Sequence, residues 1–193
     1  MRLITNSDTK DSSHLYELKS LLRTSEEIVL SSGWMKMCGL DLLREDLCLA
    51  VQRGASITIY SSQKETKPEC VVALAEIGGI QHYSVGTVYF HPKLYYGRTC
   101  ESFVAILGSA NLTKGGLQSN EELSCLMEGD VAGVEHRKLL DYLERLSQLQ
   151  NFHSTPISEK QSKKLKFKPV HKILKRGTDN GSTVSPGKSV LSE

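Results

Sequence analysis

The chain has 193 residues, 39% hydrophobic and 24% charged, with a formal net charge of +2, which predicts one soluble globular domain. It contains no apolar run near the roughly 20 residues of a membrane span, and its first residues lack the apolar core of a secretory signal. Its five cysteines are scattered and form no CxxC pair, so we expect a cytoplasmic protein without a disulfide framework, a metal site or a cofactor.

Helices and strands alternate along the first half of the chain. The patterns are leucine stripes at helical spacing and short apolar runs bounded by Ser and Gly, as in EEIVLSSGWM. Ser12 or Ser13 suits a helix N-cap, and Gly54 and Gly78 suit helix ends. Helices are predicted over residues 12–27, 39–54 and 68–79, and strands within residues 26–35, 55–62 and 80–85.

Two further strands and a closing helix complete the predicted body. TVYFHPKLYYGR and SFVAILGSAN predict strands over residues 87–98 and 102–111. GVEHRKLLDYLERLSQL predicts an amphipathic helix over residues 133–149. Strands that alternate with helices are typical of α/β folds, so we expect a mixed β-sheet flanked by helices.

The chain changes character after about residue 150. Residues 1–150 hold 15 Lys and Arg against 19 Asp and Glu, whereas residues 151–193 hold 9 against 3. Basic and apolar residues are interleaved over residues 160–176, and the last residues are rich in Gly, Ser, Pro and Thr. We therefore predict a body over residues 1–150 and a tail or linker over residues 151–193. The basic segment either contacts a polyanion, packs on the body or is a solvated tail.

One segment, YFHPKLYYGRTCESFVAILGSANLTKGGLQSNEEL, gathers a base, a cation, a small-residue turn and a carboxylate. Residues two apart on a strand share a face, so His91 and Lys93 are expected to project together. Pro92 cannot donate to a sheet ladder, which predicts an edge strand or a strand that starts there. Downstream, Ser109 offers a hydroxyl and Asn111 an amide donor after a glycine turn.

These groups suit the cleavage of a phosphodiester. Lys93, the Asn111 amide and the Ser109 hydroxyl can hold the non-bridging phosphate oxygens and stabilise the extra charge of a pentavalent transition state. A neutral His91 can attack phosphorus and form a covalent phosphohistidine. A carboxylate, here Glu121 or Glu122, can fix the tautomer of the imidazole. No cluster of Asp, Glu and His in the sequence suggests a metal site.

Each of these residues also has an ordinary structural explanation. A lone His in a strand is most often a polar residue without catalytic function. GSAN can be a strand–helix turn with Asn as a cap, and NEEL can be the first turn of a helix. The order HxK, GSxN and NxE, each at a predicted strand end, favours the functional interpretation.

The segment resembles the phospholipase D superfamily, whose signature is HxKx4Dx6GSxN. HPK, GSAN and NEE occur in the same order. The resemblance matches the motif residues to His91, Lys93, Ser109 and Asn111, and the acidic residue of the nuclease branch to Glu122. It implies a phospholipase D-like nuclease fold that acts without a cofactor.

The resemblance covers roughly residues 10–145 and departs from the signature at one point. Arg98 stands where the signature has its aspartate, and GSAN arrives three residues later than the signature places it. The metal-independent restriction endonucleases of the superfamily tolerate this change, so the chain is more similar to them than to true phospholipases. Arg98 and Lys114 either contact the phosphate backbone or are solvated, and Trp34 either belongs to the core or lines the substrate cleft.

The resemblance implies a metal-independent endonuclease that hydrolyses nucleic acid, with DNA as the expected substrate, in restriction or phage defence. The alternatives are a phospholipase or phosphatidyl transferase, and a nucleic-acid-binding module without catalysis. The superfamily reaction uses two histidines, whereas this chain has one HxK that is followed by GSxN, so we expect a homodimer with a shared active site. Sequence recognition is expected to come from a partner subunit or a fused domain, and no membrane partner is expected.

Overall fold

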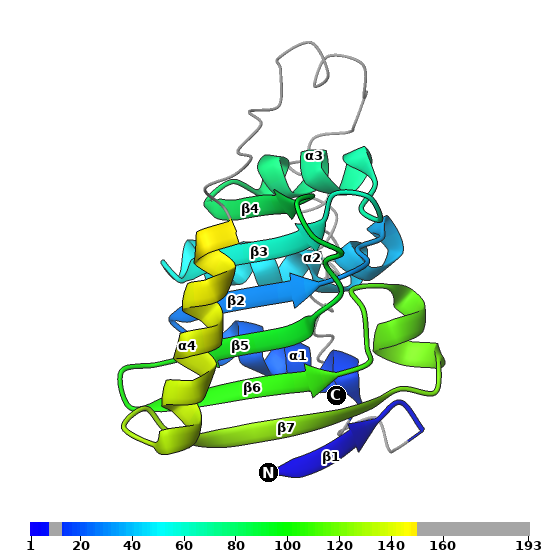
Figure 1. Cartoon of the computed structure of the whole chain (residues 1–193). Helices are drawn as coiled ribbons and strands as arrows, with labels where there is room; N and C mark the ends of the chain where they lie inside the picture. Colours follow the sequence, from blue (N-terminus) through cyan, green and yellow to red (C-terminus); the bar gives the residue numbers. More distant parts are fainter. Residues whose placement is uncertain (8–12, 150–193) are drawn as a thin grey trace, which may run out of the picture. The chain divides into compact units, whose positions relative to one another are not determined.

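A mixed β-sheet forms the centre of the computed structural model, which describes residues 1–7 and 13–149. Within these residues the sheet has seven strands in the order β1-β7-β6-β5-β2-β3-β4 (Figure 1). Strands β2, β3 and β4 are parallel neighbours, and all other neighbouring pairs are antiparallel. The strands are β1 Arg2–Thr5, β2 Glu27–Ser32, β3 Ser56–Ser62, β4 Ile80–Val85, β5 Lys93–Arg98, β6 Ser102–Gly108 and β7 Leu123–Asp130.

Helices cover both faces of the sheet, which confirms the predicted mixed sheet flanked by helices. On one face lie α1 His14–Thr24, α2 Met37–Gln52 and α3 Pro68–Ile77, and α4 Val134–Gln148 crosses the other (Figure 1). The predicted cap at Ser13 forms, because its side chain accepts the backbone N–H of Tyr16 at 3.3 Å. Gly54 has φ of 88° just beyond α2 and Gly78 has φ of 71° at the end of α3, as their predicted roles as helix ends require.

Two apolar layers, one on each face of the sheet, hold the helices in place. The leucines of the stripes in α1 and α2 pack with Tyr95 in one layer, and Leu94 and Tyr96 pack with Leu139 of α4 in the other. Adjacent residues of β5 thus enter opposite layers, as strand alternation requires.

A buried histidine of α4 attaches this helix to the sheet. His136 Nδ1 lies 2.7 Å from the Val131 carbonyl oxygen, so it carries the proton, and Nε2 accepts from the Tyr96 hydroxyl at 2.8 Å. Burial raises the pKa of Tyr96 to about 12, which keeps this hydroxyl a donor. The imidazole also stacks on Phe103, with 4.9 Å between ring centroids.

Three features differ from the sequence-based expectation. Strands β1 and β7 were not predicted, and a short π-helix, η1 Gly115–Ser119, follows the GSAN turn. The predicted strand over residues 87–98 begins only at Lys93, directly after Pro92, because proline has no N–H for the ladder. Strand β5 is central rather than an edge, so the proline marks a strand start. The tail predicted over residues 151–193, including the basic segment 160–176, lies outside the described residues.

Candidate active site

The site lies at one end of the strands of the sheet, where four neighbouring strands begin or end. Ser32, the last residue of β2, is opposite Lys93, the first residue of β5. Gly108, the last residue of β6, is opposite Ser124 at the start of β7. This end of the strands is the one toward which the arrowheads of β2 and β6 point in Figure 1. The three parts of the motif, distant by up to 31 positions, therefore meet in space.

His91 and Lys93 contact each other directly. The Lys93 Nζ lies 2.8 Å from Nδ1 and 3.0 Å from Nε2 of His91, and 3.1 Å from the His91 carbonyl oxygen. Partial burial lowers the pKa of Lys93, and the nearby Glu122 carboxylate acts in the opposite direction. Gly33 permits this packing, because a Cβ there would lie 3.1 Å from both Cα and Cδ2 of His91.

Ser109, Asn120 and Glu122 form a second cluster beside this pair. The Ser109 hydroxyl donates to Oε2 of Glu122, and the Asn120 amide donates to Oε1 at 3.2 Å. The backbone N–H of Leu123 donates to the Ser109 hydroxyl at 3.1 Å. Both oxygens of Glu122 thus have donors, so the carboxylate orients Ser109 and Asn120, and the expectation that it also orients an imidazole stays a prediction.

Asn111 is held by the segment that follows β2. Its Oδ1 accepts the backbone N–H of Trp34 at 3.0 Å, which leaves the NH₂ end of the amide as the donor toward a ligand. Ser32 supports both segments, because its hydroxyl donates to the Trp34 carbonyl at 2.7 Å and accepts the Leu112 N–H at 3.0 Å. The position of this amide is therefore fixed by backbone atoms rather than by mobile side chains.

The structure brings most of the predicted site residues to this edge. Trp34 is 41% exposed rather than part of the core. Lys114 is exposed directly before η1, close in sequence to Asn111. Sequence reasoning assigned no function to Tyr89, whose ring stacks on His91 with 5.5 Å between centroids and 13° between planes. The sequence signal for this exposed ring was the alternation of side-chain directions in YFHPK, because Phe90 is buried and its neighbour Tyr89 therefore points the other way.

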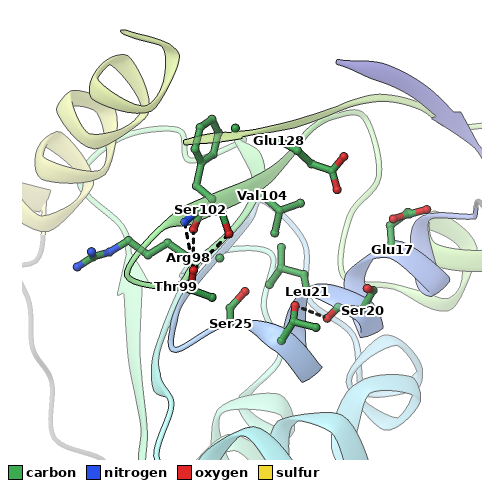
Figure 2. Close-up of a pocket in the computed structure, with 13 residues that line it drawn as sticks. Glu17, Ser20, Leu21, Ser25, Arg98, Thr99, Ser102, Val104 and Glu128 are labelled. Carbon is green, nitrogen blue, oxygen red and sulfur yellow. Dashed lines mark hydrogen bonds between the residues drawn. The ribbon is translucent and has the colours of Figure 1, made fainter. Parts of the chain in front are cut away.

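Arg98 does not lie with the other predicted site residues. It ends β5, so about 16 Å of strand separate it from Lys93. Its guanidinium pairs with Glu27, Nη2 to Oε2 at 2.6 Å, and this contact raises the pKa of Arg98. Arg98 lines a pocket of about 440 Å³ between α1 and the β5–β6 turn, where Thr99 and Ser102 also lie (Figure 2).

A buried histidine that sequence reasoning did not assign lies beneath the second cluster. His14 Nε2 lies 2.8 Å from the Ser124 hydroxyl, and Nδ1 lies 2.8 Å from Oδ1 of Asn6. The Asn6 amide donates in turn to the carbonyl oxygens of Gly116 and Asn120, at 2.9 and 3.0 Å. Burial lowers the pKa of His14, with Glu122 opposing this effect. No sequence signal marked His14, because one of its partners, Ser124, lies 110 positions away and the other, Asn6, follows a different element, β1.

The described residues offer no group of three or more His, Cys, Asp and Glu side chains placed to bind a metal ion. Within the same residues, no helix combines the length and the apolar character needed to cross a membrane. The cation that the site itself supplies is Lys93, next to His91.

The same fold occurs in two solved structures. NucT from Helicobacter pylori and Nuc from Salmonella typhimurium, a phospholipase D family member, each give a TM-score of 0.58 at 16% sequence identity. Both alignments cover 76% of this chain, and they cover 94% of NucT and 93% of Nuc. No protein-family model and no curated protein matches the sequence. At this identity the likeness establishes the fold, which is phospholipase D-like.

Proposed function

We propose that the chain is a phosphodiesterase that hydrolyses nucleic acid, with DNA as the expected substrate, without a metal ion. The observation that carries the proposal is the direct contact of His91 with Lys93 at the edge where Ser109, Asn111 and Glu122 also lie. The phospholipase D-like fold supports it, because Nuc is a phospholipase D family member. A phospholipase or an inactive binding module is not favoured by any contact at this site.

The proposed reaction begins with His91. In a neutral imidazole one ring nitrogen carries a free lone pair, and this nitrogen can attack phosphorus while the Lys93 ammonium lies beside the ring. The new N–P bond replaces the bond to the leaving oxygen, and water then cleaves the phosphohistidine. Lys93 and the Asn111 NH₂ group would stabilise the charge on the non-bridging oxygens. Glu122 would keep Ser109 and Asn120 in position.

The leaving oxygen needs a proton, and we propose that a second copy of the chain supplies it. The sequence has one HxK that is followed by GSxN, and the second HxK, at His136–Lys138, lies on α4, where both ring nitrogens of His136 already bond to Tyr96 and Val131. His14, the nearby buried histidine, already uses both ring nitrogens for Asn6 and Ser124. An isologous dimer would place two His91 side chains in one shared site, one as nucleophile and one as acid. Light scattering with activity measured across dilution tests this, because a fully active monomer would contradict it.

Any sequence recognition would come from elsewhere. A role in restriction or phage defence requires the choice of a target, and we propose that a partner subunit or a fused domain makes this choice. The site described above contacts a phosphodiester and its immediate surroundings, which suits cleavage rather than the reading of a sequence.

The test is a cleavage assay with DNA and RNA substrates in millimolar chelator. The wild-type protein should remain active, and His91→Ala should lose at least about 10³-fold in rate, as expected for loss of a covalent nucleophile. A substrate labelled at the scissile phosphate should leave label on denatured wild-type protein and none on His91→Ala. Arg98→Ala is the control, because Arg98 lies at the far end of β5 and should leave the rate unchanged. Activity that disappears in chelator and returns with Mg²⁺ would contradict the mechanism.

A further inference from the structure

Two exposed aromatic rings lie next to the His91–Lys93 pair, and the proposed chemistry uses neither of them. Tyr89 is 77% exposed and Trp34 is 41% exposed. Among the described residues, Tyr16 of α1 is the other exposed aromatic side chain of comparable degree, at 48%. Large aromatic side chains are usually buried in a core, so two exposed rings beside one catalytic pair need an explanation.

The Tyr89 ring and the Trp34 backbone both contact residues of the site. Tyr89 stacks face to face on the imidazole of His91, with 5.5 Å between centroids and 13° between planes. Trp34 follows Gly33, which lies against His91, and the Trp34 backbone N–H donates to Asn111. The backbone at Trp34 is further held by Ser32, whose hydroxyl donates to the Trp34 carbonyl. The Tyr89 ring and the backbone that carries the Trp34 ring are thus held in place by the site.

Positive charge accompanies the rings. The Lys36 Nζ lies 5.7 Å from the centre of the Trp34 ring, within cation–π range, and Lys93 lies against His91. Proteins that bind single strands combine cations that follow the phosphates with aromatic rings on which bases stack. In a duplex each base face is already covered by its neighbours, so only an unstacked base can use such a ring.

We propose that Tyr89 and Trp34 are stacking platforms for bases next to the scissile phosphate, and that the site takes single-stranded nucleic acid in preference to duplex. This inference rests on the proposed function, because it places the reacting phosphate at His91. It explains why rings of this size stay exposed there, and why a lysine lies over one of them.

The platform can be measured directly because Trp34 is the only tryptophan of the chain. A catalytically silent Lys93→Ala protein is titrated with a short single-stranded DNA and with the matching duplex. The single strand should quench tryptophan fluorescence and bind at least about tenfold more tightly than the duplex, in the range of one stacked base. Equal affinity for both forms would overturn the proposal.

Ring-removing variants separate stacking from charge. Tyr89→Leu should weaken single-strand binding about tenfold, measured by anisotropy of a labelled strand, whereas Tyr89→Phe keeps the ring and should bind as the parent does. Tyr16→Leu is the matched control, because Tyr16 lies on the helix face opposite buried His14 and Leu18. Tyr89→Leu that binds normally, or Tyr16→Leu that loses as much affinity, would overturn the proposal.

Two further outcomes are distinguishable. If Tyr89→Leu dissociates a dimer in light scattering and binding falls only through that dissociation, the rings form a protein interface and the proposal is wrong. Cleavage with the unmodified protein reports on the proposed function by itself. If single strand and duplex are cleaved equally and Tyr89→Leu changes neither rate, the stacking proposal is wrong and the proposed nuclease activity is supported. If single-strand binding depends on the rings but no nucleic acid is cleaved, the stacking proposal is supported and the proposed nuclease activity is wrong.

Discussion

At the scale of residues, the motif predicted which side chains gather at the candidate site, and the structure adds those that hold them. His91, Lys93, Ser109 and Asn111 lie close enough in the sequence for spacing and strand alternation to predict their meeting. His14 could not be predicted, because its partner Ser124 lies 110 positions away. Long-range pairing of this kind depends on which strands become neighbours, and a local pattern does not encode it.

The tautomer of His14 follows from its neighbours. Asn6 donates its NH₂ group to two carbonyl oxygens, so its Oδ1 faces His14 and Nδ1 must carry the proton. Nε2 is then the acceptor for the Ser124 hydroxyl. The histidine thereby connects the segment after β1 with the start of β7, next to Glu122.

Replacement of His14 should therefore cost more than the loss of one hydrogen bond. His14→Ala leaves the buried Ser124 hydroxyl and Asn6 Oδ1 without this partner, and we expect unfolding free energy to fall by about 2 to 3 kcal/mol. Ser124→Ala removes a single interaction and should cost about 1 kcal/mol. Urea unfolding of the two variants measures the difference. Equal losses in both would show that the Asn6 contact contributes nothing.

At the scale of elements, segments with a clear local apolar pattern were predicted and those without one were not. The leucine stripes predicted α1 and α2, and apolar runs predicted β2, β3 and β6. Strand β7, with the sequence LSCLMEGD, buries only Ser124 and Leu126, and the edge strand β1 buries only Ile4. Neither carries a local apolar pattern strong enough to indicate a strand, because each depends on pairing with a strand distant in the sequence.

The first turn of α2 packs tightly on the segment that carries Asn111. A Cβ at Gly39 would lie 2.3 Å from the Leu112 carbonyl oxygen and 2.6 Å from Cα of Thr113. The Lys36 N–H donates to the same Leu112 oxygen at 3.1 Å, so the backbone of the two segments is already joined there. Neither backbone can move away cheaply.

Gly39→Ala should consequently separate α2 from this segment. We expect a loss of about 2 to 3 kcal/mol in unfolding free energy, as for overpacked cores, and a fall in cleavage rate because the Asn111 amide moves. Cys38→Ala, at the exposed neighbouring position, is the control and should stay within about 0.5 kcal/mol of the parent. Thermal unfolding and a single-turnover assay give the two readouts. A Gly39→Ala protein as stable and as active as Cys38→Ala would contradict this packing argument.

At the scale of the whole molecule, the helices on the two faces of the sheet come from different parts of the chain. The layer with α1, α2 and α3 belongs to the alternating helix–strand half of the chain, and α4 closes the other face. The site lies where the parallel half and the antiparallel half adjoin, since β2 pairs with β3 on one side and with β5 on the other. An alternating pattern predicted the class of fold, but only the strand order places His91 beside Gly33 and Trp34.

The stability of the molecule should depend on pH through a histidine far from the site. His82 lies on β4, at the end of the strand order, and its Nε2 lies 2.9 Å from the Ser61 hydroxyl. Burial lowers the pKa of His82 from the ordinary histidine value of 6.5 to about 4. The folded chain therefore keeps this imidazole neutral between those two values, whereas the unfolded chain protonates it.

Stability should consequently fall as the pH is lowered through this window. The unfolded state binds more protons below pH 6.5, so between pH 8 and pH 5 His82 alone should remove about 2 kcal/mol of unfolding free energy. His82→Gln cannot gain the proton and should flatten the profile over this range. A smaller slope of the same sign should remain, because burial also lowers the pKa of His14. Urea unfolding at several pH values tests both statements: a parent profile that is flat from pH 8 to pH 5, or a His82→Gln profile as steep as that of the parent, would contradict them.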